Sequence, residues 1–154
     1  MKNAAAICVA LLSAGMIAGQ DRGKTEDIRD TFAGAWRLAS LERPDADGKV
    51  QRINCSGSFI FTRDGHASVQ VMERRPEAKS AAGPQQYSQG GYEASWGTYR
   101  VDERAHVFVF HIEGALVRSL IGKDLPRVYE FSGKQLIVKS TRSDEHWRVT
   151  WERY

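Results

Sequence analysis

The chain has 154 residues, of which 42% are hydrophobic and 27% charged, as is usual for one soluble globular domain with its own core. Its net charge of +3 comes from Lys and Arg residues scattered among Asp and Glu, and the only adjacent basic pair is Arg74-Arg75. A nucleic-acid surface needs basic residues gathered on one face or one element. The composition therefore argues against a nucleic-acid partner.

Residues 1–19 have the pattern of a secretory signal peptide. Lys2 gives a positive start, and an apolar run over residues 4–12 is followed by small residues. This run is too short and wrongly flanked for a membrane span. Three small residues can precede the cleavage site: Gly15, Ala18 and Gly19. We therefore expect a secreted or periplasmic protein with no stable membrane insertion after the signal is removed.

The mature chain shows no pattern for a disulfide, a metal or a cofactor. Removal of the signal discards Cys8 and leaves Cys55 alone, so no internal disulfide can form. The four histidines lack metal-ligand spacing: His66, His106, His111 and His146. We expect the core to hold the domain together, with no metal and no cofactor.

Residues 25–32 predict a short helix within an N-terminal segment that covers residues 20–33. Thr25 can cap the helix, and acidic residues fill its first turn. Ile28 and Phe32 fall on one face, four residues apart. Such a helix is suited to plug one mouth of a barrel.

Eight strand-like runs follow, separated by turn signals. They cover residues 36–42, 58–62, 66–72, 92–101, 106–113, 127–131, 135–140 and 146–152. No helix of crossover length lies between them, which argues against an α/β fold. The spacing predicts an all-β barrel or sandwich over residues 34–154.

The two ends of this domain favour a barrel over a sandwich. Trp36 opens the first strand after Gly34, and Trp151 lies in the last strand, just before Arg153. An antiparallel sheet can close by pairing its first and last strands, which removes the exposed edges. We expect Trp36, Trp151 and Arg153 to lie at this closure.

Two long connections interrupt the strands. Residues 76–91 are rich in Ala, Gln, Gly and Ser, which predicts a mobile loop or lid at a barrel mouth. Residues 114–126 contain Leu116, Leu120 and Leu125, so this connection is expected to fold inward. Together the two connections would frame the mouth.

An eight-stranded barrel is either just filled by side chains or holds one small ligand. Side chains alternate between the two faces of a strand, which predicts a strongly aromatic interior. The aromatic rings either form the core or line a pocket for an apolar, partly polar molecule. The predicted pocket residues are Phe59, Phe61, Tyr99, His111, Glu113, Arg127, Tyr129 and Trp147.

The polar members of this set form one candidate constellation: His111, Glu113, Arg127 and Tyr129. They lie on two consecutive strands, which usually pair. Facing inward, they would need to pair with one another or with a ligand, because burial without partners is costly. Three interpretations stay open: an internal salt bridge or outward-facing His111 and Glu113, an anchor for a ligand, or acid–base catalysis by His111. Strand 106–113 is ambiguous, since its other face carries Phe108, Phe110 and Ile112.

Several short motifs occur in a characteristic order between residues 34 and 153. They are Gly34–Leu38, Phe61–Ser68, Trp96–Val101, Phe110–Gly114, Gly122–Arg127, Leu136 and Trp151–Arg153. On these motifs the chain resembles the bacterial members of the lipocalin-like domain family, within the calycin superfamily. The resemblance implies an eight-stranded antiparallel up-and-down barrel with an N-terminal plug. It also implies that Trp36 packs against a C-terminal Arg, for which Arg153 is the candidate. The sequence departs from the family at Phe61, where a Tyr is usual.

Three functions from different classes fit these observations. The preferred one is a secreted barrel that binds a small hydrophobic or amphipathic molecule, oriented by His111 and Arg127. The second is an isomerase or lyase that uses the same pocket with His111 as acid or base. The third is a filled barrel whose surface docks a protein. An open cavity would favour the first or second, and a filled lumen with an exposed apolar patch would favour the third.

Overall fold

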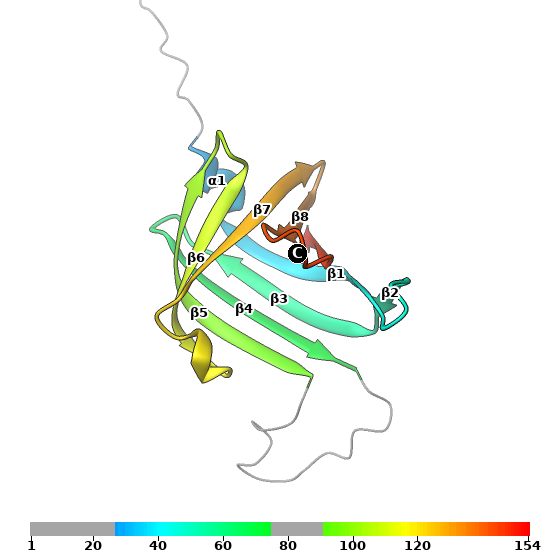
Figure 1. Ribbon diagram of the computed structural model, residues 1–154. Helices are drawn as coiled ribbons and strands as arrows, with labels where there is room; N and C mark the ends of the chain where they lie inside the picture. Colours follow the sequence, from blue (N-terminus) through cyan, green and yellow to red (C-terminus); the bar gives the residue numbers. More distant parts are fainter. Residues whose placement is uncertain (1–26, 75–90) are drawn as a thin grey trace, which may run out of the picture.

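A computed structural model describes residues 27–74 and 91–154 (Figure 1). The elements run in the order α1 (Ile28–Phe32), β1 (Gly34–Pro44), β2 (Val50–Ile53), β3 (Cys55–Phe61), β4 (His66–Glu73), β5 (Tyr92–Asp102), β6 (Val107–Ala115), the 3-10 helix η2 (Arg118–Leu120), β7 (Asp124–Ser132), β8 (Gln135–Ser140) and β9 (Arg148–Arg153). The predicted signal peptide, Thr25 and all of the predicted loop 76–91 except Gly91 lie outside the described residues.

All strands belong to one antiparallel sheet, in which β1 pairs with β3 and each later strand pairs with the next. β1 also pairs with β9, with Trp36 opposite Arg153 and Leu38 opposite Trp151. This pairing closes β1 and β3–β9 into an eight-stranded barrel, which confirms the predicted fold and its closure through the two Trp strands.

One strand was not predicted. β2 is a four-residue strand that pairs with the second half of β1 and projects beside the barrel (Figure 1). The first half of β1, up to Arg37, pairs with β3 instead. β2 therefore covers the stretch of β1 that has left β3. Two of its four residues are polar and three are exposed, so they carry no alternating pattern that would identify a strand.

The helix α1 plugs one end of the barrel, as predicted. Its cap is Asp27, whose side chain accepts a hydrogen bond from the Arg29 N–H at 3.0 Å. Phe32 is completely buried and enters the barrel from this end. Five aromatic rings surround it, with centroid distances of 4.9–5.9 Å: Phe61, Tyr99, Phe108, Tyr129 and Phe131. These rings pack around Phe32 at the plugged end of the barrel.

Arg153 fastens the plug to the closure of the sheet. Its guanidinium carbon lies 4.4 Å from the centre of the Trp36 ring, which confirms the expected cation–π contact. The two terminal nitrogens donate to the carbonyls of Ala33 at 2.9 Å and Thr31 at 2.6 Å. Gly34 makes room for this side chain, because a Cβ there would lie 2.7 Å from Arg153 Nη1.

Within residues 27–74 and 91–154, no helix combines the length and hydrophobicity needed to cross a lipid bilayer. The same ranges bring together no group of three or more His, Cys, Asp or Glu side chains in a metal-binding arrangement. Cys55 is half-buried at the start of β3, where burial raises the pKa of its thiol.

Replacing Phe32 by Ala should lower the free energy of unfolding by about 3–5 kcal/mol, because the plug would lose its contacts with five rings and leave a cavity. Urea denaturation followed by far-UV circular dichroism measures this. Ile60→Ala on the outer face of β3, where the side chain is 44% exposed, is the control and should cost less than about 1 kcal/mol. Equal losses in the two variants would contradict the plug assignment.

Candidate functional site

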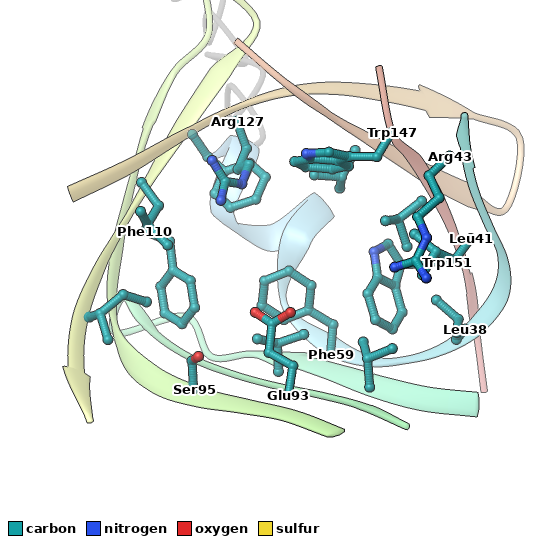
Figure 2. A pocket seen from close by; sticks show the side chains of 17 residues that line it. Leu38, Leu41, Arg43, Phe59, Glu93, Ser95, Phe110, Arg127, Trp147 and Trp151 are labelled. Atoms are coloured by element: carbon teal, nitrogen blue, oxygen red, sulfur yellow. The ribbon is translucent and has the colours of Figure 1, made fainter. Parts of the chain in front are cut away.

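The barrel encloses a cavity of about 310 Å³ between the plugged core and the opposite end. On β5 the inward residues become smaller away from the plug, from Tyr99 in the plugged core to Gly97 and Ser95. The facing residues of β4 are small or aliphatic throughout: Ala67, Val69 and Val71. The cavity lining consists of Leu38, Leu41, Arg43, Phe59, Val69, Val71, Glu93, Ser95, Phe108, Phe110, Ile112, Leu125, Arg127, Val138, Trp147, Val149 and Trp151 (Figure 2). The lining is therefore a mixture of aromatic and aliphatic side chains that does not fill the interior at this level.

Charged groups meet the cavity at the end away from the plug. Figure 2 shows Arg43, Glu93 and Arg127 reaching inward from three different strands, β1, β5 and β7. Arg43 pairs with Glu73 at 3.1 Å. Further inside, Ser95 is buried on the same face of β5 as Glu93. The lining therefore combines an apolar body with polar groups gathered mainly at one end.

Arg127 differs from the other cation at the cavity. Its guanidinium lies 5.2 Å from the centre of the Trp147 ring and donates to the Pro126 carbonyl at 2.9 Å. Burial lowers the pKa of Arg127, while the more distant charges of Glu145 and Glu93 oppose this shift. Among the described residues no carboxylate forms an ion pair with it. Arg127 thus presents a half-buried positive charge to the cavity.

A β-bulge places Arg43 in the cavity. Opposite β9, Leu38 pairs with Trp151 and Ser40 with Thr150, so Ala39 is an extra residue in β1. The inward face consequently shifts from Trp36 and Leu38 to Leu41 and Arg43. Arg52 supports the bulge by donating to the Ala39 carbonyl at 2.8 Å. Strict alternation from Trp36 would have turned Arg43 outward, which is why the sequence pattern did not identify it.

The structure divides the predicted pocket residues into three groups. Phe59, Arg127 and Trp147 line the cavity. Phe61, Tyr99 and Tyr129 are also inside the barrel, but they pack around Phe32 in the plugged core. His111 and Glu113 do not line the cavity. Trp36, Trp151 and Arg153 lie at the closure, and Trp151 lines the cavity as well.

His111 and Glu113 were predicted as pocket residues, but the packing of β6 places them away from the cavity. Phe108, Phe110 and Ile112 are the buried residues of this strand, so His111 faces outward. Between Gly114, opposite Trp96, and Ile112, opposite Gly97, Glu113 is the extra residue of a bulge. The apolar alternative for the inward face was therefore the right one, since buried aromatic rings stabilise the core more than unpaired charges would.

On the outer face, His111 belongs to a small polar cluster. Its Nδ1 lies 2.7 Å from Asp124 Oδ1, and Arg100 donates to the other oxygen of Asp124 at 3.0 Å. The hydrogen bond from His111, and then that from Arg100, holds the pKa of the Asp124 carboxyl below its ordinary value. This cluster ties β5, β6 and β7 together outside the barrel and has no access to the lumen.

Glu93 and Ser95 were also missed, although the sequence contains their signal. They continue the alternation of Tyr99 and Gly97 backwards along β5. Extending that face to the start of the strand would have placed both residues inside. Leu125, in the connection expected to fold inward, does line the cavity, while Val117 and Ile121 beside it are exposed.

A family model described as a lipocalin-like domain matches residues 33–154 of the chain. Among solved structures, a mutant of the fluorescent protein UnaG matches with 14% sequence identity and a TM-score of 0.40. That alignment covers 81% of this chain and 97% of the UnaG chain. No curated protein sequence matches the chain.

Replacing His111 by Val should raise the titration midpoint of Asp124 toward the ordinary carboxyl value of 3.8, because the strongest contact that stabilises its charged form is removed. NMR detection of the side-chain carboxyl during an acid titration measures this. In the wild type the depressed pKa favours the folded state above that ordinary value, and the benefit is lost as the pH falls through the folded pKa. Val109→Ala is the control; an unchanged midpoint in the His111 variant would contradict the assignment.

Proposed function

This chain belongs to the lipocalin-like domain family, and from that premise we propose that it binds one small amphipathic molecule inside the barrel. In this proposal the acidic group of the ligand binds Arg127 at the end of the cavity away from the plug. The apolar body extends toward the plug among the aliphatic and aromatic lining. Mostly apolar cavities with a few placed polar groups are the usual form of small-molecule sites.

The observation that carries the proposal is Arg127 itself. A guanidinium taken out of water loses solvation free energy, which a carboxylate in direct contact normally restores. Within the described part of the chain, Arg127 has a ring and a carbonyl as close partners but no carboxylate. A ligand carboxylate or sulfonate would supply the missing negative charge through short, charge-assisted hydrogen bonds.

The cavity also limits the size of the ligand. At about 310 Å³ it lies at the lower end of the range of about 300–1,000 Å³ found for small-molecule sites. Rings from Phe59, Phe110 and Trp147 provide flat contact surfaces, and Leu and Val residues provide the rest. We therefore propose a medium-chain or single-ring acid rather than a large polycyclic molecule.

The two alternative functions receive less support. An isomerase or lyase that uses His111 would need the imidazole beside the cavity, but His111 is held by Asp124 on the outer face. A docking module would need a filled lumen, whereas the described residues leave a cavity there. Binding of a small molecule is the function that uses the features on the inside of the barrel.

Secretion is a further part of the proposal. The apolar run and small residues within positions 1–19 support export and cleavage, which would leave the barrel and its plug as the mature protein. A secreted or periplasmic binding protein would meet its ligand outside the cytoplasm.

Replacing Arg127 by Met should weaken binding of the probe dodecanoic acid by about 10- to 100-fold, because a charge-assisted hydrogen bond is lost while the bulk of the side chain stays. Isothermal titration calorimetry measures the dissociation constant. His111→Val is the matched control, and it should change that constant by less than about twofold because the residue is outside the barrel. Similar effects of the two substitutions would contradict the assigned anchor.

A second pair of variants tests whether the probe binds in the lumen at all. Val69→Phe adds a ring to the cavity wall and should abolish binding, whereas Gln70→Phe adds the same ring to the exposed outer face of β4. Circular dichroism and thermal melting establish that both variants fold. Full binding by a folded Val69→Phe protein would exclude the cavity as the site.

Expression of the full chain in a Gram-negative host should yield a protein that is shortened at its N-terminus and recovered from the periplasm. Intact-mass spectrometry should give a mass that corresponds to cleavage after Gly15, Ala18 or Gly19. A full-length protein retained in the cytoplasm would overturn the proposed export.

A further inference from the structure

The indole of Trp151 carries an unexplained polar group in the wall of the cavity. The side chain is 2% exposed, and its Nε1 is the one buried side-chain nitrogen or oxygen in the described residues without a hydrogen-bond partner. An unpaired buried N–H costs folding free energy, so natural proteins rarely keep one without a reason. Because Trp151 lines the cavity, a molecule bound there could supply the missing acceptor.

The other three tryptophans have either a hydrogen-bond acceptor for the indole N–H or a side chain exposed to water. Trp36 Nε1 donates to the Phe32 carbonyl at 2.8 Å, and Trp147 Nε1 donates to Glu145 Oε2 at 3.2 Å. Trp96 is 55% exposed on the outer surface. Trp151 alone of the four is buried and unpaired.

No acceptor in the neighbouring wall is suited to the Trp151 N–H. The indole packs edge-on against Phe59, with ring centroids 5.4 Å apart, and its residue pairs across the sheet with Leu38 and Leu136. Figure 2 shows the ring on the inner wall beside Leu38 and Leu41. The backbone carbonyls of these strands are used by the ladder that closes the barrel.

We propose that Trp151 Nε1 is a second recognition point, which donates a hydrogen bond to an oxygen acceptor toward the apolar end of the ligand. This inference rests on the proposed function, with the acidic group at Arg127. Because the site is shielded from water, a hydrogen bond there discriminates strongly between ligands that have the acceptor and ligands that lack it. The ligand class is then an oxygenated amphipathic acid, such as an oxo or ester-containing acid, rather than a plain alkyl acid.

The positions of the two recognition points suggest their separation. Arg127 stacks on Trp147, which directly precedes β9, and Trp151 lies in β9 four residues further along the same wall. Four residues of strand span about 13 Å. An acceptor near the far end of a medium-chain acid would therefore reach Trp151 while the carboxylate stays at Arg127.

The test compares dodecanoic acid with a set of its mono-oxo derivatives, in which the ketone is moved along the chain. Isothermal titration calorimetry gives, for each protein, the ratio of the dissociation constants of dodecanoic acid and the best oxo isomer. Trp151→Phe keeps a ring but removes the N–H, so this ratio should fall roughly tenfold, because the lost ring area affects both ligands and the lost N–H affects only the oxo isomer. Trp147→Phe is the matched control and should preserve the ratio, because the Trp147 N–H is already donated to Glu145.

A measurement on the unmodified protein covers the case in which Trp151→Phe does not fold. In the NMR spectrum of the indole N–H groups, the assigned Trp151 proton should move downfield with the best oxo isomer and not with dodecanoic acid. An unchanged Trp151 signal with every isomer, or an unchanged ratio in a folded Trp151→Phe protein, would overturn the inference and leave the proposed function standing. Failure of all these acids to bind would reject both.

Discussion

The architecture depends on the contact between Arg153 and the ring of Trp36. Through it one side chain joins the first strand, the last strand and the helix, because its nitrogens also hold the carbonyls of Thr31 and Ala33. Those carbonyls belong to the end of α1, where a short helix would otherwise leave them unpaired. The same side chain, Arg153, therefore supports both the closure of the sheet and the attachment of the plug. A sheet that opened here would expose two strand edges and release Phe32 from the core together.

With one end sealed, the chemistry of the barrel is ordered along its axis. β5 shows the order within a single strand: Tyr99 lies in the plugged core, Gly97 and Ser95 follow, and Glu93 lies at the cavity. On this strand a large ring packs in the sealed end, and shorter side chains beyond it leave room for the cavity. The charged side chains lie at the end away from the plug, where water can reach them. This lowers the desolvation free energy of placing a charge on an inward face. The packed core and the cavity thus occupy different levels of one interior, and Phe59, which contacts Phe61 and lines the cavity, lies between them.

Most of this arrangement follows from local patterns in the sequence. Turn signals separate all eight barrel strands, and the period of two places Phe59, Arg127 and Trp147 inside. The pattern fails where the period is broken. The extra residues Ala39 and Glu113 shift the inward face of their strands. Neither is a residue type that predicts a β-bulge from the sequence. His111 is a different case, since two faces of β6 were plausible until the core of Phe rings selected one. The unpaired N–H of Trp151 could not be predicted, because hydrogen-bond partners across the sheet depend on three-dimensional packing.

The bulge at Ala39 has an evolutionary consequence. Beyond it in β1 the residues that face the lumen are Leu41 and Arg43, and before it Trp36 is fixed by Arg153. Deletion of the extra residue would leave this assignment unchanged, because Ser40 would then follow Leu38 directly and Leu41 would still lie opposite Val149 with its side chain in the lumen. The bulge therefore absorbs a difference of one residue in the length of β1. Descendants of such a barrel could gain or lose a residue at position 39 while the cavity lining and the sealed end stayed the same.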